Sequence, residues 1–222
     1  MPSTVALAPI RHVSVVTCAM TVVTCVTGAL GTWTSWHRYL VAVDYVAGEP
    51  GVGVAAYVSA DNKAANIALL WLISYGVTCV TFLTWSWRSR ANAERLCPVP
   101  HRLSPGWVVG GWLVLVLPLV VLEDVWRTSR PHMAEVSHAR ELPRAPLVRY
   151  WWAASMACVA IGLWLAAVRN GEPTLEVLLD IAMITTVLAV LQLVAAVLEI
   201  AMIRQITDWQ SIPRTTRHST VE

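Results

Sequence analysis

Charged residues are scarce in this 222-residue chain. They make up 14% of the sequence, whereas hydrophobic residues make up 56% and the mean hydropathy is +0.58. Soluble domains are about a quarter charged, so this composition cannot cover a water-soluble surface. The scarcity excludes an ordinary soluble domain and predicts an integral membrane protein with the lipid bilayer as its main partner.

Lysine and cysteine are also few. A single lysine, Lys63, accompanies fifteen arginines, and the net charge is only +2. The basic residues gather near the ends of apolar runs and form no continuous basic stripe, so we expect no nucleic-acid partner. The five cysteines contain no CxxC pair, which gives no indication of a disulfide framework or a zinc site.

Familiar catalytic and cofactor motifs are missing as well. The sequence has no HExxH, no GxSxG, no Walker A motif and no GxGxxG opening a helix. Its histidines lie in loops or near the ends of apolar runs, where they could not hold a haem between facing helices. We therefore expect no catalytic residues, no metal and no cofactor, and the sequence favours a protein that is not an enzyme.

Four apolar runs are present, and each is long enough to cross roughly 30 Å of hydrocarbon as a helix. They cover residues 13–36, 64–87, 150–168 and 175–203. In lipid the backbone must satisfy its own hydrogen bonds, so each run is predicted as a helix despite its Val and Thr. The first run leaves a second interpretation open, a cleaved signal peptide, although it is longer than a usual signal core.

A fifth apolar run, 106–122, is short, begins with glycines and is interrupted by Pro118. If it does not cross the membrane, thirteen basic residues lie inside and three outside; if it crosses, the better orientation leaves ten and six. The positive-inside rule therefore favours a re-entrant or interfacial segment. The predicted fold class is an all-α integral membrane protein with four transmembrane helices plus this segment. It forms one membrane domain, 13–203, in the cell membrane, with cytoplasmic tails at 1–12 and 204–222.

The last apolar run carries two polar residues, Gln192 and Glu199, which lie on the same face of the predicted helix. Polar side chains inside a membrane are costly and should face protein or water. They could form an intramembrane polar site for an ion or a substrate. The structural alternative, which the sequence favours, has Gln192 hydrogen-bonded across helices and Glu199 reaching the interface or Arg204.

A charged and aromatic cluster is expected on the cytoplasmic face, where the second helix and the fifth run end. Its arginines could hold a lipid phosphate or a partner's carboxylate, because the guanidinium is a planar fork of donors. Alternatively, its acids and arginines pair with one another and fix the fifth run in place. The candidate interaction residues are Arg88, Arg90, Asn92, Glu94, Trp107, Trp112, Asp124 and Trp126.

Four stretches of this region form an ordered pattern: WSWRSRANAE at 85–94, SPGWVVGGW at 104–112, EDVWRTS at 123–129 and ITDWQ at 206–210. The pattern resembles a family of actinobacterial multi-pass membrane proteins catalogued as a domain of unknown function, over residues 65–210. The stretch between Trp112 and Glu123 departs from it, with more aliphatic residues and a lone proline. The resemblance implies a topology and no reaction.

The leading hypothesis is a non-catalytic scaffold or accessory subunit that binds a membrane or cytoplasmic protein partner, or lipid, at the cytoplasmic face; a homo-oligomer is compatible with it. The alternative is a small transport or immunity component that uses the Gln192 and Glu199 face. This alternative requires a water-accessible cavity between helices that reaches Gln192. A third hypothesis, a membrane enzyme, would need a site near Arg90, Glu94 and Asp124.

Overall fold

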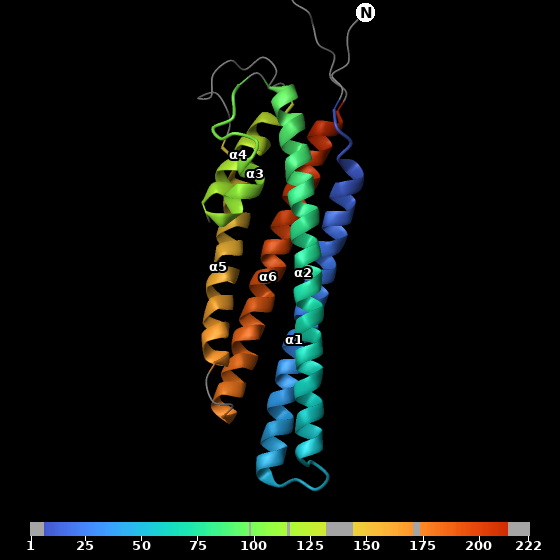
Figure 1. Ribbon diagram of the computed structural model, residues 1–222, viewed down its shortest axis with the longest axis vertical. Helices are drawn as coiled ribbons and strands as arrows, with labels where there is room; N and C mark the ends of the chain where they lie inside the picture. The colour runs from blue at the N-terminus through green and yellow to red at the C-terminus, as the bar shows by residue number, and fades with distance from the viewer. Residues whose placement is uncertain (1–6, 98, 115, 132–143, 171–173, 213–222) are drawn as a thin grey trace, which may run out of the picture. The chain divides into compact units, whose positions relative to one another are not determined.

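The computed structural model describes residues 7–97, 99–114, 116–131, 144–170 and 174–212, and the regular structure in these residues is entirely helical. Four helices are long and apolar enough to cross a membrane: α1 (Arg11–Ala47), α2 (Val54–Leu96), α5 (Pro146–Arg169) and α6 (Leu175–Ser211). Shorter pieces lie between α2 and α5: α3 (Trp107–Gly110), the 3₁₀ turn η1 (Gly111–Leu113) and α4 (Leu117–Thr128) (Figure 1). The predicted fold class, all-α with four candidate membrane spans and additional short helices, is confirmed.

The long helices extend beyond the apolar runs that predicted them. α1 continues to Ala47 instead of ending at 36, α2 begins at Val54 instead of 64, and α6 continues through 204–211, which were expected in the C-terminal tail. Once a helix is nucleated, each added residue gains a backbone hydrogen bond, so the helix extends until it meets a residue that disrupts the hydrogen-bond pattern, such as proline. The first prolines beyond the helix ends are Pro50 after α1, Pro98 after α2 and Pro213 after α6, and at Gly48 the positive φ already takes the chain out of the helix.

The connection between α1 and α2 is a tight turn, because α1 ends at Ala47 and α2 begins at Val54. Gly48 and Gly51 have φ values of 73° and 89°, in the left-handed region that side chains other than glycine rarely adopt. At the start of α6, the Thr174 hydroxyl accepts a hydrogen bond from the amide of Val177 at 3.3 Å and caps the helix.

Large aliphatic side chains point outward from the long helices. Leu72, Leu163 and Val197 have 58%, 69% and 60% of their surface exposed. A soluble protein rarely leaves such extensive apolar surface in water, whereas lipid chains cover it without cost. The chain is therefore a membrane protein.

The chain divides into two compact units, and α1, α2 and α6 each contribute to both. Unit 1 consists of Met1–Cys18, Cys79–Tyr150 and Leu198–Glu222, and unit 2 consists of Ala19–Thr78 and Trp151–Val197. Unit 1 holds the short helices and most of the charged residues. Unit 2 holds apolar stretches of α1, α2, α5 and α6 and the turn between α1 and α2.

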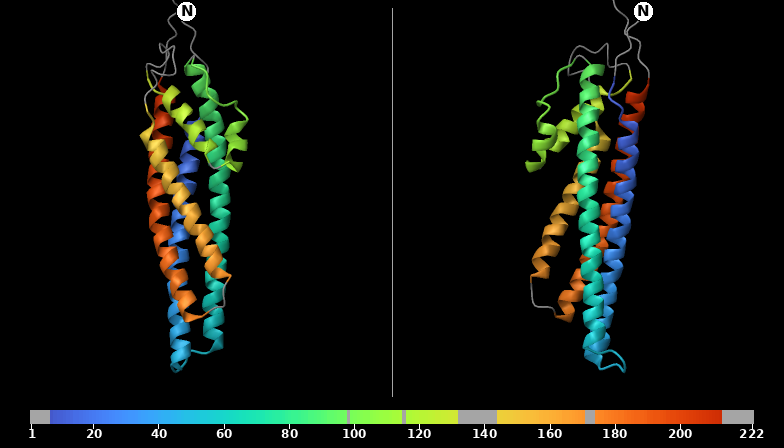
Figure 2. Two further views of the ribbon diagram at one scale, coloured as in Figure 1. Left: turned by 90° about the vertical axis from the view of Figure 1, so that its left-hand side faces the viewer. Right: turned by 45° about the vertical axis from the view of Figure 1, so that its right-hand side comes forward.

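In unit 2, hydroxyl side chains join α1 to its neighbours. The hydroxyls of Thr24 and Thr78 lie 2.8 Å apart, and the Thr32 hydroxyl donates to the carbonyl of Thr185 on α6 at 3.1 Å. Such small residues let helix backbones approach closely in lipid, where no hydrophobic effect drives association. α5 packs on α6 through Leu165, Ile181 and Ile184, and the two views of Figure 2 show these helices side by side.

In unit 1, the ends of α2 and α6 are joined by buried hydrogen bonds. The indole N–H of Trp85, which is fully buried, donates to the hydroxyl of Thr207 at 3.2 Å. The amide of Gln210 donates to the carbonyl of Ser89 at 2.9 Å and to the hydroxyl of Ser129 at 2.7 Å. The bonds of Gln210 place Ser129, the residue that follows α4, beside the ends of α2 and α6.

Candidate functional site

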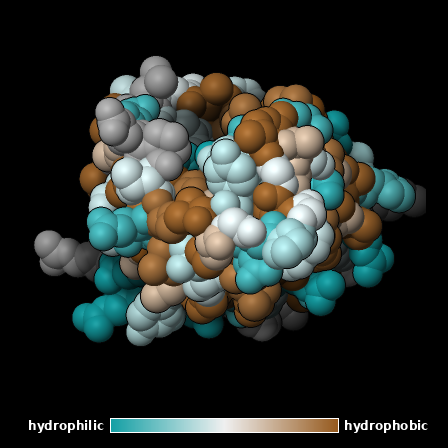
Figure 3. Space-filling view, turned by 90° about the horizontal axis from the view of Figure 1, so that it is seen from below, coloured by the Kyte–Doolittle hydropathy of each residue, from teal (hydrophilic) through white to brown (hydrophobic). Residues whose placement is uncertain are grey.

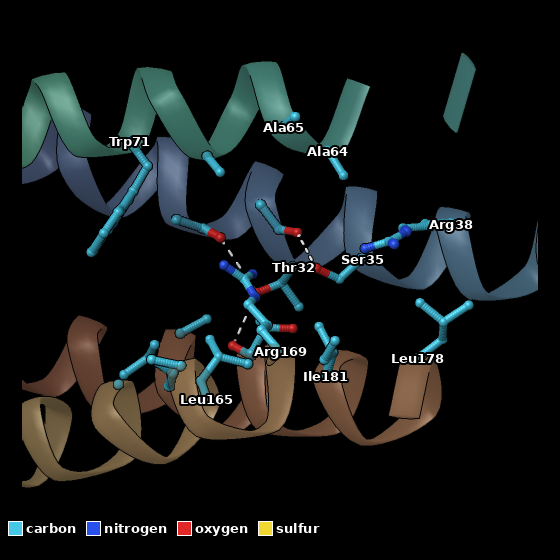
Figure 4. A pocket seen from close by; sticks show the side chains of 18 of the residues that line it. Thr32, Ser35, Arg38, Ala64, Ala65, Trp71, Leu165, Arg169, Leu178 and Ile181 are labelled. Atoms are coloured by element: carbon cyan, nitrogen blue, oxygen red, sulfur yellow. Dashed lines mark hydrogen bonds between the residues drawn. The ribbon is translucent and has the colours of Figure 1, made fainter. Parts of the chain in front are cut away.

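A pocket of ≈ 510 Å³ lies within unit 2, bounded by α1 and α2 on one side and by α5 and α6 on the other (Figure 4). This volume is in the range of pockets that take one small ligand. Its lining includes Gln192, one of the two intramembrane polar residues predicted from the sequence. The other, Glu199, belongs to unit 1 and does not line this pocket.

The wall formed by α1 and α6 is polar. Thr27, Thr32, Ser35, Thr185 and Gln192 contribute to it. The hydroxyls have partners inside the bundle, for example Thr27 with Ser74 at 3.0 Å and Ser35 with the carbonyl of Gly31 at 2.9 Å. The first of these bonds joins α1 to α2, and the second lies within α1.

Gln192 differs from the other polar residues of this wall, because its carboxamide makes no hydrogen bond with any residue that the structure describes. Its oxygen lies against the backbone of Gly28, so close that a Cβ at Gly28 would come within 2.7 Å of it. A partly buried amide without a partner carries an unmet hydrogen-bonding capacity. Gln192 of α6 therefore contacts α1 at Gly28, but its side chain makes no hydrogen bond across the helices to a described residue.

Another part of the lining, from α5 and α6, is aliphatic. Leu165 and Gly162 of α5 and Ile181 and Leu188 of α6 contribute to it. A Cβ added at Gly162 would meet no atom within 4 Å, so the pocket has open space beside this glycine. One polar wall and one aliphatic wall suit a ligand that has both kinds of surface.

Three charged residues line the same pocket: Arg38 of α1, Asp61 of α2 and Arg169 at the end of α5. Arg38 pairs with Asp61 at 2.9 Å, while Arg169 has no carboxylate partner among the described residues. Figure 3 views the end of unit 2 that carries the turn between α1 and α2, and hydrophilic residues lie there among hydrophobic ones. Sequence reasoning placed these three residues in the outer loops and missed the site they share.

In unit 1 the predicted interaction residues mostly bind one another or the backbone. Arg90, only 2% exposed, donates to Glu94 at 2.9 Å and to the carbonyl of Leu103. Asn92 exchanges two hydrogen bonds with the backbone of Ala8, at 2.7 and 2.9 Å. Arg88 donates to the carbonyl of Pro9 at 3.1 Å.

Two adjacent buried carboxylates of α4 form the centre of this charged cluster. Asp124 accepts hydrogen bonds from the backbone N–H and from Nε of Arg102, at 2.9 and 2.7 Å. Glu123 accepts from Arg102, Arg127 and Arg149, at 3.2, 3.2 and 2.5 Å. Burial raises the pKa of Glu123, but the bond from Arg149 and the charges around it outweigh burial and lower the pKa below its ordinary value of 4.5.

His101 lies beside these acids and was not predicted as part of the site. Its Nε2 is 3.1 Å from the hydroxyl of Thr128. Burial, together with the charge of Arg90, lowers the pKa of His101 from 6.5 to about 4, against the opposing effect of Asp124 and Glu94. The imidazole is therefore neutral at physiological pH. Because His101 and Arg102 lie between prolines in a connecting segment, no periodicity could have shown that they meet α4.

The predicted tryptophans divide into two groups. Trp126 donates to Gln205 at 3.0 Å and packs edge-on against Trp209 with the ring centres 5.1 Å apart. Trp107 and Trp112, on α3 and η1, keep 41% and 40% of their surface exposed. Exposed indole rings favour the membrane–water boundary, so only this second group remains free to meet lipid or a partner.

These features define a polytopic helical membrane protein with an internal pocket in one unit and a self-paired charged cluster in the other. The chain belongs to a family described as a domain of unknown function (DUF4328), whose model matches residues 52–208. No curated protein matches the chain, and no solved structure matches it. The family assignment confirms the resemblance to a domain of unknown function that the sequence pattern indicated.

Proposed function

We propose that this chain binds a small amphiphilic molecule inside the membrane, in the pocket of unit 2, as a binding or transport component. The observation that carries the proposal is the ≈ 510 Å³ pocket that reaches Gln192. The transport alternative called for a cavity that reaches Gln192, and this pocket supports that part of it. The unpartnered carboxamide of Gln192 gives a ligand a hydrogen-bonding group, and the aliphatic wall gives it apolar surface to cover.

The scaffold hypothesis remains a prediction, with less support from the geometry. Arg90, Glu94 and Asp124 already bind groups of this chain, so a partner would have to displace existing bonds. The residues left for a partner or for lipid are the exposed Trp107 and Trp112. An accessory role at this face would therefore depend on aromatic contacts more than on charge.

We also propose that segment 106–122 lies at the cytoplasmic membrane interface and does not cross. It consists of α3, η1 and the beginning of α4, pieces too short to span the hydrocarbon. Four crossings then put both termini on one side, and the charge asymmetry makes that side cytoplasmic.

Cysteine labelling would test this topology. The native Cys97 is only 3% exposed and is a poor probe. Glu49→Cys and Ser104→Cys in a cysteine-free background are better, since both positions are exposed. In intact cells, an impermeant maleimide should label position 49 and leave position 104 unlabelled. Labelling of position 104 from outside would contradict the topology.

Photocrosslinking would test the pocket. The full-length protein is placed in phosphatidylcholine vesicles that contain phosphatidylcholine with a diazirine in one acyl chain, and labelled residues are mapped by mass spectrometry. Leu165 and Ile181 are each 7% exposed, so bulk lipid should not reach them. Labelling of these residues would show an acyl chain inside the pocket.

A pair of glycine variants supplies the control. Gly162→Leu fills the pocket without a clash, and Gly76→Leu makes the same change on α2 outside it; neither Cβ would meet an atom within 4 Å. We expect Gly162→Leu to reduce labelling of Leu165 and Ile181 severalfold and Gly76→Leu to leave it unchanged. Labelling confined to outward residues such as Leu163 in every protein would contradict the proposed function.

A further inference from the structure

The charges of the unit 2 pocket do not balance. Two guanidiniums, Arg38 and Arg169, line it together with one carboxylate, Asp61, and that carboxylate already pairs with Arg38. Figure 4 shows Arg169 extending from α5 into the region between the two pairs of helices. Among the residues that the structure describes, the pocket therefore carries an excess positive charge, and Arg169 carries it.

An uncompensated guanidinium beside an apolar wall selects an anion with an apolar part. Arg presents parallel N–H donors that match the oxygens of a phosphate. A free inorganic anion would leave the aliphatic part of the pocket lining uncovered, and a neutral amphiphile would leave Arg169 without an anionic partner among the described residues. An anionic lipid satisfies both surfaces.

We infer that the ligand of this pocket is an anionic phospholipid, with its phosphate on Arg169 and one acyl chain along Leu165, Ile181 and Leu188. The inference rests on the proposed function and names the ligand's chemistry. A pocket of ≈ 510 Å³ is of the size that takes one small ligand, so it admits one chain of the lipid, while the second chain stays in the bilayer. The carboxamide of Gln192 is available to a polar group of the same molecule.

The experiment compares two photoactivatable lipids, phosphatidylglycerol and phosphatidylcholine, each at trace level in phosphatidylcholine vesicles containing the full-length protein. The quantity measured is the ratio of phosphatidylglycerol to phosphatidylcholine label on Leu165 and Ile181. One basic residue near a membrane surface favours an anionic lipid by about 1 kcal/mol, which is about fivefold. We expect a ratio of about that size in the wild-type protein.

Two charge variants separate a specific contact from general attraction. Arg169→Gln removes the guanidinium of the pocket, and the labelling ratio of this variant should fall toward one. Lys63→Gln removes one exposed positive charge from α2 outside the pocket lining, and its ratio should stay at the wild-type value. If Arg169→Gln does not fold, displacement of the label by unlabelled phosphatidylglycerol but not by unlabelled phosphatidylcholine gives the same answer on the wild-type protein.

The possible outcomes distinguish this inference from the proposed function. Equal pocket labelling by both lipids in the wild-type protein overturns the anionic ligand and leaves the pocket function standing. An equal loss of preference in Lys63→Gln and Arg169→Gln also overturns it, because surface charge alone would then explain the selectivity. If neither lipid labels Leu165 or Ile181, the proposed function and this inference both fail.

Discussion

Glu123 offers the sharpest test of the charged cluster in unit 1. Its carboxylate is 5% exposed and accepts hydrogen bonds from three arginines. Glu123→Gln keeps the size and shape of the side chain but removes its negative charge. The guanidiniums of Arg102, Arg127 and Arg149 would then face a neutral amide, one end of which is itself a donor.

The expected loss follows from the exposure of the partners. Arg127 is the best buried of the three, 18% exposed, and a hydrogen bond to a charged group of this kind contributes about 1.5–3 kcal/mol. Arg102 and Arg149 are about half exposed, at 48% and 53%, so solvent screens their contributions. We expect Glu123→Gln to lower the free energy of unfolding by about 2–3 kcal/mol.

The assay is unfolding of the full-length protein in detergent micelles by added dodecyl sulfate, followed by tryptophan fluorescence. Because the folded pKa of Glu123 lies below 4.5, its contribution is fully present above that pH and is lost as pH falls through the lower folded value. Glu123→Gln should therefore lower stability at neutral pH and weaken its acid dependence below pH 4.5. The exposed Glu49→Gln serves as the control. If the Glu123→Gln protein unfolds like the wild-type protein both at neutral pH and below pH 4.5, the cluster does not hold α4 in place.

Three further perturbations address other contacts of unit 1. Between pH 6.5 and about 4, His101 is protonated in the unfolded chain but not in the folded one, so the wild-type protein should lose up to about 3 kcal/mol of its free energy of unfolding as the pH falls. His101→Gln should remove this loss, which unfolding experiments across that pH range would measure. Asn92→Ala removes both hydrogen bonds to the backbone of Ala8 and should make the N-terminal segment more sensitive to protease, while an unchanged cleavage rate would count against this anchor. Gly111→Val should lower the unfolding midpoint, because a Cβ at Gly111 would lie 3.1 Å from a side chain of α4. Gly110→Val should lower it less, because a Cβ there would meet nothing nearer than 4.0 Å. Equal effects of the two variants would contradict this packing.

The number and type of the main elements were predictable from the sequence, because run length and the absence of water fix them. Four runs long enough to cross the hydrocarbon gave the four long helices. Their ends were not predictable from hydropathy. Gly48 and Pro98 mark them better, since helix ends depend on residues that stop the hydrogen-bond pattern rather than on the boundary of the membrane.

The candidate sites were predictable only in part. Gln192 could be singled out because a polar residue in an apolar helix stands out alone. Arg38, Asp61 and Arg169 come from three different helices, and their meeting depends on how those helices pack. The Gly48–Gly51 turn offered one clue, because a tight turn between α1 and α2 brings Arg38 close to Asp61.

The energetics of the two charged regions explain why the pocket is the stronger candidate for ligand binding. In unit 1, a ligand phosphate that bound Arg102 would have to replace the two bonds that this residue makes to Asp124, and would leave a buried carboxylate without its partner. In unit 2, Arg169 and the carboxamide of Gln192 have no described partner to lose. A ligand that contacts them need not break any hydrogen bond or ion pair between described residues, and it can lie along the aliphatic part of the pocket lining at the same time. In a chain with so few charges, a guanidinium that has no carboxylate partner among the described residues is therefore more informative than the larger number of paired ones.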